Sequence, residues 1–268
     1  MNPQTRAAAA ETPLVLVIGG HDPSGAGLQA DIETAAALGC HAASLVSCLT
    51  TQNTGRVAEV IPTAGSTLLA QFGLLVADWP GIAACKIGLV PTVDVVHALA
   101  ALLRRLPAGT PVVLDPVVAA GSGAELMSAA VRRALLAELW PFATLRTPNR
   151  EEAAALAAVA GASDTAAWRR SQAGWVLVKG ADATTPEVIH ELDRDGQLHT
   201  RSRWRRLPGQ FHGTGCTLAT AIACELARGM PVADACAAGL DYTWRCLLDP
   251  LDFGGAQQLP RRLPRSAP

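Results

Sequence analysis

Short candidate strands that alternate with longer amphipathic stretches limit, more than any other feature, what this chain can fold into. The strands are predicted at residues 14–18, 44–49, 82–87, 112–114, 144–146 and 175–178. Stretches with apolar residues at helical spacing, such as 28–38 and 93–103, separate them. Because most of the strands are apolar almost throughout, both of their faces are expected to be buried, as in a parallel sheet covered by helices. We therefore predict an α/β protein with a three-layer αβα sandwich and a mostly parallel central sheet.

The C-terminal half adds a hairpin and a helical segment to this pattern. Residues 188–192 and 198–202 flank Asp193-Arg194-Asp195-Gly196, a link that predicts a small β-hairpin at the edge of the sheet. Residues 213–248 are predicted to be helical, with a break at Gly229-Met230-Pro231. The hairpin would therefore end the sheet.

A length of 268 residues fits one large α/β domain, and no repeat or linker divides the chain. We expect a single domain over residues 13–248. Residues 1–12 are expected to be a flexible tail, and residues 249–268, rich in Pro, Gly and Arg, an irregular C-terminal tail.

Composition narrows the class of ligand. The 22 basic and 23 acidic residues nearly cancel, and aromatic residues make up only 4% of the chain, so we expect neither a nucleic-acid partner nor a membrane surface. No run of 18 apolar residues is present, and the start of the sequence has no long apolar run, so we expect neither a membrane span nor a secretory signal. The cysteines are scattered without a CxxC pair, which is typical of reduced thiols in a cytoplasmic protein. The partner is expected to be a small molecule.

Polar clusters follow the predicted strands repeatedly. They lie at residues 19–27, 50–54, 115–123, 147–152, 179–182 and 208–216. In an open parallel sheet, ligands bind beyond the carboxyl ends of the strands. The clusters are therefore predicted to meet in one site.

The cluster Gly213-Thr214-Gly215-Cys216 opens a predicted helix. Glycines allow a tight turn, and the first turn of a helix presents N–H groups without intrahelical partners, so the turn is suited to hold a transferring phosphoryl group. The pKa of the Cys216 thiol is expected to be lowered there, which would let it accept a proton from a substrate hydroxyl. The alternative is an ordinary glycine-rich helix cap followed by a buried cysteine.

Two clusters carry candidates for substrate binding. Gln52 lies in a predicted polar loop, residues 50–55, and its amide offers a donor and an acceptor that match an aminopyrimidine edge. The alternative is a solvated loop glutamine. The loop 19–27 fits neither the P-loop nor the dinucleotide fingerprint. In it, Asp22 would either hold a substrate hydroxyl or cap the following helix.

Two more clusters carry candidates for nucleotide binding. Asn149 and Glu152, three residues apart at a helix start, could hold Mg²⁺ through water beside nucleotide phosphates. The same residues would also form a capping box. Lys179 ends an apolar strand, where it would either contact a phosphate or be solvated.

Seven runs, in order, resemble hydroxymethylpyrimidine/phosphomethylpyrimidine kinases and span about residues 14–248. They are Ile18-Gly19-Gly20-His21-Asp22-Pro23-Ser24-Gly25-Ala26-Gly27-Leu28-Gln29-Ala30-Asp31, Leu49-Thr50-Thr51-Gln52-Asn53-Thr54, Lys86-Ile87-Gly88, Leu114-Asp115-Pro116-Val117, Thr147-Pro148-Asn149 with Glu152, Val178-Lys179-Gly180, and His212-Gly213-Thr214-Gly215-Cys216-Thr217-Leu218. Seven ordered matches are far more specific than any one of them.

The resemblance implies a ribokinase-like αβα sandwich, a homodimer, and the use of ATP with Mg²⁺. It implies two successive phosphorylations of 4-amino-5-hydroxymethyl-2-methylpyrimidine, giving the diphosphate for thiamine biosynthesis. Position by position, the resemblance assigns pyrimidine binding to Gln52, Asp22 and Gly20. It assigns the anion hole to Gly213, Thr214 and Gly215, and the role of base to Cys216. It assigns phosphate or ATP contacts to Lys179, Asn149 and Asp115, and the binding of Mg²⁺ through water to Glu152.

The chain departs from this family at three places. The first loop has one glycine fewer than the usual Asp-Pro-Ser-Gly-Gly-Ala-Gly, Gly180-Ala181-Asp182 stands where Gly-Gly-His is preferred, and residues 119–123 lack a lysine that many members carry.

Two alternative functions fit the same fold. A pyridoxal/pyridoxine kinase of the same superfamily is disfavoured because a pyridine lacks the amino-amidine edge that Gln52 would bind. A non-catalytic pyrimidine-binding protein is disfavoured because it would need no anion hole at Gly213-Thr214-Gly215.

Overall fold

The fold is built around one mixed sheet. The computed structural model describes residues 12–121, 123–180 and 185–263. Their strands form a nine-stranded sheet in the order β3-β2-β1-β4-β5-β6-β7-β8-β9. The strands are β1 (Leu14–His21), β2 (His41–Asn53), β3 (Arg56–Pro62), β4 (Ile82–Ile87), β5 (Val112–Leu114), β6 (Leu145–Arg146), β7 (Trp175–Val178), β8 (Glu187–Arg194) and β9 (Gln197–Arg205). All neighbours from β2 through β1 and β4 to β7 pair in parallel.

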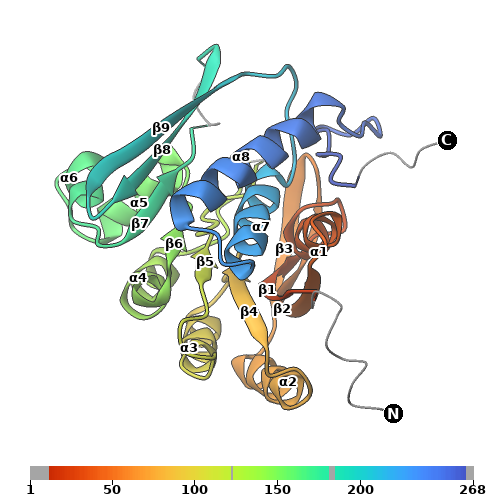
Figure 1. The fold of residues 1–268 in the computed structure, drawn as a ribbon, viewed down its shortest axis with the longest axis vertical. Coiled ribbons are helices and arrows are strands. Elements are labelled where there is room, and N and C mark those ends of the chain that lie inside the picture. The colour runs from red at the N-terminus through yellow and green to blue at the C-terminus, as the bar shows by residue number, and fades with distance from the viewer. Residues whose placement is uncertain (1–11, 122, 181–184, 264–268) are drawn as a thin grey trace.

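Helices cover both faces of this sheet (Figure 1). On one face lie α1 (Gly27–Ala37), α7 (Thr214–Ala227) and α8 (Val232–Leu248). On the other lie α2 (Gly65–Asp78), α3 (Val93–Leu103), α4 (Ala129–Glu138), a 3₁₀ turn (Trp140–Phe142), α5 (Arg150–Val159) and α6 (Thr165–Arg170). The predicted three-layer sandwich is confirmed.

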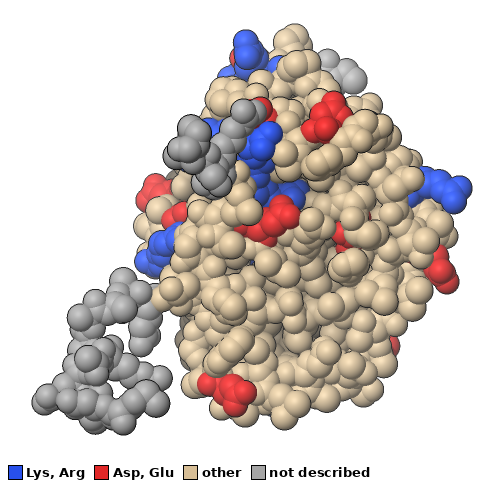
Figure 2. All heavy atoms as spheres, turned by 90° about the vertical axis from the view of Figure 1, so that its right-hand side faces the viewer, with Lys and Arg blue, Asp and Glu red and all other residues tan. Residues whose placement is uncertain are grey.

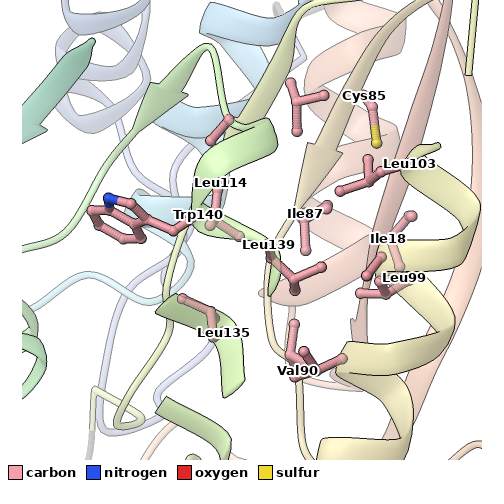
Figure 3. Packing of buried hydrophobic residues seen from close by; sticks show 14 of the residues in the cluster. Ile18, Cys85, Ile87, Val90, Leu99, Leu103, Leu114, Leu135, Leu139 and Trp140 are labelled. Carbon is pink, nitrogen blue, oxygen red and sulfur yellow. The ribbon is translucent and has the colours of Figure 1, made fainter. Parts of the chain in front are cut away.

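Each face of the sheet has its own hydrophobic core, because side chains alternate along a strand. In β1, Leu16 and Ile18 join the core under α2 to α6, whereas Val15 and Val17 join the core under α1, α7 and α8. Figure 3 shows the first core, where Ile18 of β1 lies beside Ile87 of β4 and Leu99 of α3, and Leu114 of β5 and Leu135 of α4 lie further along the same layer. The two cores hold the central strands rigidly, and these strands end at the polar clusters.

Hairpins end the sheet on both sides, although the sequence predicted one only at the β8 edge. At that edge β8 and β9 pair antiparallel, and Asp195 and Gly196 turn the chain with φ angles of 51° and 73°. At the other edge β3 pairs antiparallel with β2. The predicted loop 50–55 is therefore wrong over most of its length, because β2 continues to Asn53 to make this pairing.

The predicted helices are present, and the structure adds α2, α4 and α6, which were not predicted. The predicted helical stretch 213–248 is interrupted, as expected, between α7 and α8 at Gly229, Met230 and Pro231. None of the helices in the described part of the chain combines the length and apolar character that a membrane crossing needs.

The chain after α8 turns back toward the carboxyl ends of the strands. Residues 249–263 contain isolated bridges, Phe211 with Gln258 and Leu251 with Leu259, rather than regular elements. Backbone hydrogen bonds from Gln258 to the segment before α7 hold this C-terminal segment in place. The domain limits at 13 and 248 stay a prediction, and the expected tail at residues 1–12 lies almost entirely outside the described residues.

Candidate functional site

A cavity of ≈ 220 Å³ lies where the parallel strands end and α7 begins. It is open to solvent on one side, as a site that exchanges small ligands requires. Every residue predicted from the sequence to take part in the site lines it: Gly20, Asp22, Gln52, Asp115, Asn149, Glu152, Lys179, Gly213, Thr214, Gly215 and Cys216. The structure thus brings together residues from six polar clusters that are far apart in the sequence.

The turn before α7 has the backbone geometry of an anion-binding site. Gly213 caps α7 with φ 80° and ψ 9°, in the left-handed region that favours glycine. A Cβ at Gly213 would come within 2.6 Å of Arg262 Nη2, so a side chain is excluded there for two reasons. Gly215 has no positive φ, so backbone strain does not require glycine there. Its missing side chain instead leaves room for the Lys179 ammonium, since a Cβ at Gly215 would lie only 3.3 Å from Lys179 Nζ. The hydroxyl of Thr214 is buried and has no hydrogen-bond partner among the described residues.

Cys216 lies one residue further into the first turn of α7 and keeps some exposure to the cavity. Burial raises the pKa of its thiol to about 11, and the nearby ammonium of Lys86 only partly opposes this effect. The prediction of a lowered pKa is therefore wrong, because the loss of solvation outweighs the positive end of the helix. In this state the thiol is protonated at neutral pH.

A buried cluster of charges forms the wall beside the turn. Lys179 Nζ lies 2.7 Å from Asp115 Oδ1 and 3.6 Å from Glu152 Oε2. Thr147 also donates a hydrogen bond to Asp115 Oδ1, at 2.9 Å. Burial disfavours the charge of Lys179, but the two carboxylates outweigh it and raise the pKa of the ammonium. Lys179 is therefore a fixed cation facing the cavity and not the solvated lysine of the alternative interpretation.

Asn149 and Glu152 form the capping box that their spacing predicts, and their role toward Mg²⁺ stays a prediction. The Asn149 side chain accepts a hydrogen bond from the Glu152 backbone N–H at 2.7 Å, and Glu152 Oε2 accepts one from the Asn149 N–H at 2.6 Å, which is a capping box. The two side chains also line the cavity. The capping box thus holds an amide and a carboxylate at the edge of the site.

The buried carboxyl of Glu152 gives a test of this electrostatic arrangement. Burial raises its pKa to about 7, against the opposing effect of Lys179. Because this value lies above that of an unfolded glutamate, ionisation costs stability as the pH rises from about 4.5 to 7. We expect Glu152→Gln to raise the unfolding free energy by about 1–3 kcal/mol at pH 8 and to change it little at pH 5. Thermal unfolding at the two pH values measures this difference.

The control for this experiment is Glu151→Gln, which changes an exposed carboxyl on the same turn of α5. It should show no comparable gain at pH 8. If Glu152→Gln were less stable than the wild type at pH 8, the interactions of the Glu152 carboxylate with Lys179 and the capping box would stabilise the fold by more than its burial costs.

Three predicted substrate residues reach the cavity from β1, the loop after β1, and β2. Gln52 is partly buried in β2 itself, not in a loop. Gly20 allows β1 to pass close to Cys48, whose Sγ would lie 3.0 Å from a Cβ at that position. Asp22 does not cap α1, since the N-cap is Ala26 without a side-chain hydrogen bond. Instead Asp22 Oδ2 lies 2.5 Å from Nε2 of His212.

The first loop follows a tight path in spite of its missing glycine. Asp22 Oδ1 accepts hydrogen bonds from the backbone and hydroxyl of Ser24, at 2.7 and 2.5 Å. Burial opposes the charge of Asp22, but hydrogen bonds with His212 and Ser24 outweigh it and lower the pKa of the carboxyl. Gly25 and Gly27 take positive φ angles of 103° and 54°. The anionic Asp22 thereby ties the first loop to the residue that precedes the Gly213 turn.

Among the titratable side chains of the cavity wall, Lys86 and His212 were not assigned roles from the sequence. Lys86 is fully buried, and its Nζ lies 2.8 Å from both carboxylate oxygens of Asp31. A lysine inside the apolar strand 82–87 was the signal that could have revealed this pair, because a buried charge requires a partner. Of the family departures, residues 119–121 line the cavity, while 181 and 182 lie outside the described residues.

Comparison with known proteins gives a consistent result. The family model described as phosphomethylpyrimidine kinase matches residues 22–260. The hydroxymethylpyrimidine/phosphomethylpyrimidine kinase of Mycobacterium bovis is 39% identical over 243 residues, or 88% of each chain. The phosphomethylpyrimidine kinase structure from Clostridium difficile 630 matches with a TM-score of 0.71 and 27% identity, covering 87% of this chain and 98% of that one. The pyridoxal kinase structure from Staphylococcus aureus in complex with AMP-PCP matches with a TM-score of 0.81 over 94% of both chains; at 22% identity this shows a shared fold.

Proposed function

The chain belongs to the phosphomethylpyrimidine kinase family, and from this premise we infer that it phosphorylates 4-amino-5-hydroxymethyl-2-methylpyrimidine and then its monophosphate, with ATP as donor. The product is the pyrimidine diphosphate used in thiamine biosynthesis. The fold is the ribokinase-like one that the sequence predicted. The observation that carries the proposal is one cavity lined by the amide of Gln52, by the Lys179 cation with the carboxylates of Asp115 and Glu152, and by the Gly213–Cys216 turn.

At the nucleotide end, Lys179, Asn149 and Asp115 are proposed to contact the ATP phosphates. Phosphoryl transfer depends on positioning and on neutralising charge on the transferring group. The fixed ammonium of Lys179 and the N–H groups of the Gly213–Gly215 turn supply that neutralisation. The charge of Lys179 is already balanced by Asp115. An incoming phosphate would therefore meet net positive charge only where the Lys179 ammonium lies next to the N–H groups of the turn.

The site also fits Mg²⁺ held mainly by nucleotide phosphates and water. No group of three or more His, Cys, Asp or Glu side chains in the described residues could hold a metal ion by itself. Mg²⁺ prefers oxygen ligands and commonly keeps several waters, and the carboxylates of Glu152 and Asp115 both face the cavity. We propose that Glu152 holds the ion through water, where the ion would neutralise charge on the phosphates. The elevated pKa of Glu152 implies that the ion would also displace a proton from it.

At the substrate end, Gln52 is proposed to bind the pyrimidine edge, with Asp22 and the Gly20 backbone completing the pocket. The amide would donate to a ring nitrogen and accept from the exocyclic amino group. This orientation points the hydroxymethyl group at the Cys216 thiol and the Gly213–Gly215 turn. The step uses the ionised fraction of Cys216: the hydroxyl proton passes to the Cys216 thiolate, the hydroxyl oxygen attacks the γ-phosphorus, and ADP leaves.

Substituting Gln52 tests substrate choice. Gln52→Met keeps the length of the side chain and removes its amide, leaving the pyrimidine edge poorly paired at a cost of roughly 1–3 kcal/mol. We expect kcat/KM for the pyrimidine to fall by about one to two decades, while that for pyridoxal falls less or rises. Steady-state kinetics with both substrates measure the ratio. Gln71→Met, at an exposed position on α2, is the control. Equal losses for both substrates would show that Gln52 supports the β2–β3 hairpin and does not select the ring.

The function itself is tested by turnover with hydroxymethylpyrimidine, its monophosphate and pyridoxal in parallel. Phosphorylation of the first two, with pyridoxal slower, is the expected result. Faster turnover of pyridoxal would favour the pyridoxal/pyridoxine kinase alternative. Binding of the pyrimidine without any ADP formation would favour a non-catalytic pyrimidine-binding protein.

We also propose that the protein acts as a homodimer. Support comes from the β2–β3 edge, where Leu49 and Ile61 are register partners and remain 50% and 46% exposed. Figure 2 shows that charged side chains on this side of the molecule gather mainly in the upper half of the view and leave large uncharged areas. A second copy would remove these apolar side chains from water.

A further inference from the structure

The end of the C-terminal segment, residues 249–263, reaches the back of the phosphoryl-binding turn. Figure 1 shows this segment leaving α8 and turning back beside α1. Arg262, near its end, is 3% exposed, although the sequence pattern predicted only an irregular tail there. A buried arginine needs partners for its five N–H donors. Its contacts therefore show what this part of the chain does.

Two of the three guanidinium nitrogens of Arg262 make hydrogen bonds to helices on either side. Nε donates to Thr217 Oγ1 at 2.8 Å, and Nη1 donates to Glu33 Oε2 at 2.9 Å. The same Thr217 hydroxyl donates to the carbonyl oxygen of Gly213 at 2.9 Å. A chain of two hydrogen bonds therefore joins Arg262 to the backbone of the turn, while Glu33 anchors the guanidinium to α1.

The third nitrogen, Nη2, faces the turn directly. It is buried, has no hydrogen-bond partner in the described part of the chain, and lies 2.6 Å from the position that a Cβ of Gly213 would take. The carbonyl oxygen of Gly25, from the first loop, is 3.0 Å from the same position. An unpaired donor on a buried cation is costly, so its retention calls for a functional reason. Here it places positive charge behind the N-terminus of α7, which is where the proposed reaction gathers negative charge.

We propose that Arg262 is a positioning residue for phosphoryl transfer. This role rests on the proposed kinase function. Through Thr217, Arg262 would hold the Gly213–Gly215 turn in the orientation that receives the transferring phosphoryl group. Its positive charge would also strengthen the positive potential of the turn. Arg262 lies outside the cavity wall, so it acts on the turn and not on the substrate itself. The C-terminal segment is then part of the active-site architecture.

The test compares Arg262→Ala with Arg261→Ala. Arg261 is the neighbouring residue with the same side chain, but its Nε pairs with Asp249 at the surface, 2.9 Å away. For Arg262→Ala we expect kcat to fall roughly 10- to 100-fold, with KM for the pyrimidine changed less than about threefold. Arg261→Ala should keep wild-type kinetics. Millimolar guanidinium should restore part of the lost turnover in Arg262→Ala, because the ion can enter the cavity left by the side chain, and should not change Arg261→Ala.

A structural role would give different results. If folded Arg262→Ala turned over like Arg261→Ala, or lost activity solely through a raised KM without rescue, the proposal would be wrong. If Arg262→Ala does not fold, Arg262→Lys carries the test, since it keeps the charge and loses the planar fork. Its kcat should then fall at least severalfold, and an unchanged kcat would overturn the proposal. A wild-type protein that phosphorylates no pyrimidine would instead refute the kinase function.

Discussion

Replacing Cys216 with alanine is expected to lower turnover by a factor on the order of 10² or more, while ATP binding changes little. The thiol lies in the first turn of α7 and lines the cavity beside the Gly213–Gly215 turn. Removing its sulfur takes away the proposed acceptor of the hydroxyl proton but leaves the N–H groups of the turn and Lys179 in place. Single-turnover rates and ATP titrations with the purified variant separate the two effects. Near-normal turnover would return Cys216 to a packing role.

The pH dependence of the wild-type rate provides a second measure of this role. Burial raises the pKa of the Cys216 thiol to about 11, so below that pH the ionised fraction grows about tenfold for each unit of pH. The wild-type kcat should therefore rise between pH 7 and 9, whereas the residual rate of Cys216→Ala should not follow this slope. Cys236→Ala, at a buried cysteine in α8, is the control and should keep the wild-type profile. A wild-type rate independent of pH over this range would exclude the free thiolate as the base.

The layers of the fold were predictable because they follow from local periodicity. Strand β1 is apolar almost throughout, which predicts a strand buried on both faces, and α3 has apolar residues at helical spacing, which predicts a helix packed on the sheet. The structure places both as predicted. Strand β3 was missed because Arg56–Pro62 is exposed along most of its length and mixes charged with aliphatic residues, so no alternation marks it. Helix α2 was missed because Gly65–Asp78 lacks an N-cap side chain and has an almost continuous apolar stretch.

The members of the candidate site were predictable for a different reason. Most follow a strand or open a helix, Gly20 and Gln52 lie near the carboxyl ends of β1 and β2, and parallel strands present these ends at the same edge of the sheet. Their electrostatic states were not predictable, since these depend on burial by distant segments. The thiol of Cys216 illustrates this point: its position at a helix N-terminus predicts a lowered pKa, whereas the surrounding protein raises it.

Contacts between the chain ends were also beyond reach of the sequence pattern. Arg262 and Glu33 are separated by 229 residues, and neither belongs to a recognisable motif. The ion pair of Lys86 and Asp31 is similar, although a lysine within an apolar strand does signal that some partner must exist. In both cases the sequence indicates a requirement, and the three-dimensional fold selects the residue that meets it.

Placing a side chain at Gly215 should have the largest effect of all on turnover. A Cβ there would lie 3.3 Å from Lys179 Nζ and 3.6 Å from Asp115 Oδ2, and the two further methyl groups of valine would enter the space proposed for the phosphoryl group. We expect Gly215→Val to lower kcat by on the order of 10³, because it displaces the cation and blocks the turn together. Gly215→Ala should lose less, since the flexible end of Lys179 can yield by a few tenths of an ångström.

Strain is not the cause of this expected loss, because the left-handed residue of the turn is Gly213 and not Gly215. The matched control is Gly81→Val, at a glycine that also lacks a positive φ and has no described heavy atom within 4 Å of its Cβ position. It should keep wild-type turnover. Circular dichroism and thermal unfolding confirm that each variant is folded before the rates are compared. Full activity in folded Gly215→Val would show that the phosphoryl group is held elsewhere. The roles proposed for Lys179 and the Gly213–Gly215 turn would then be wrong.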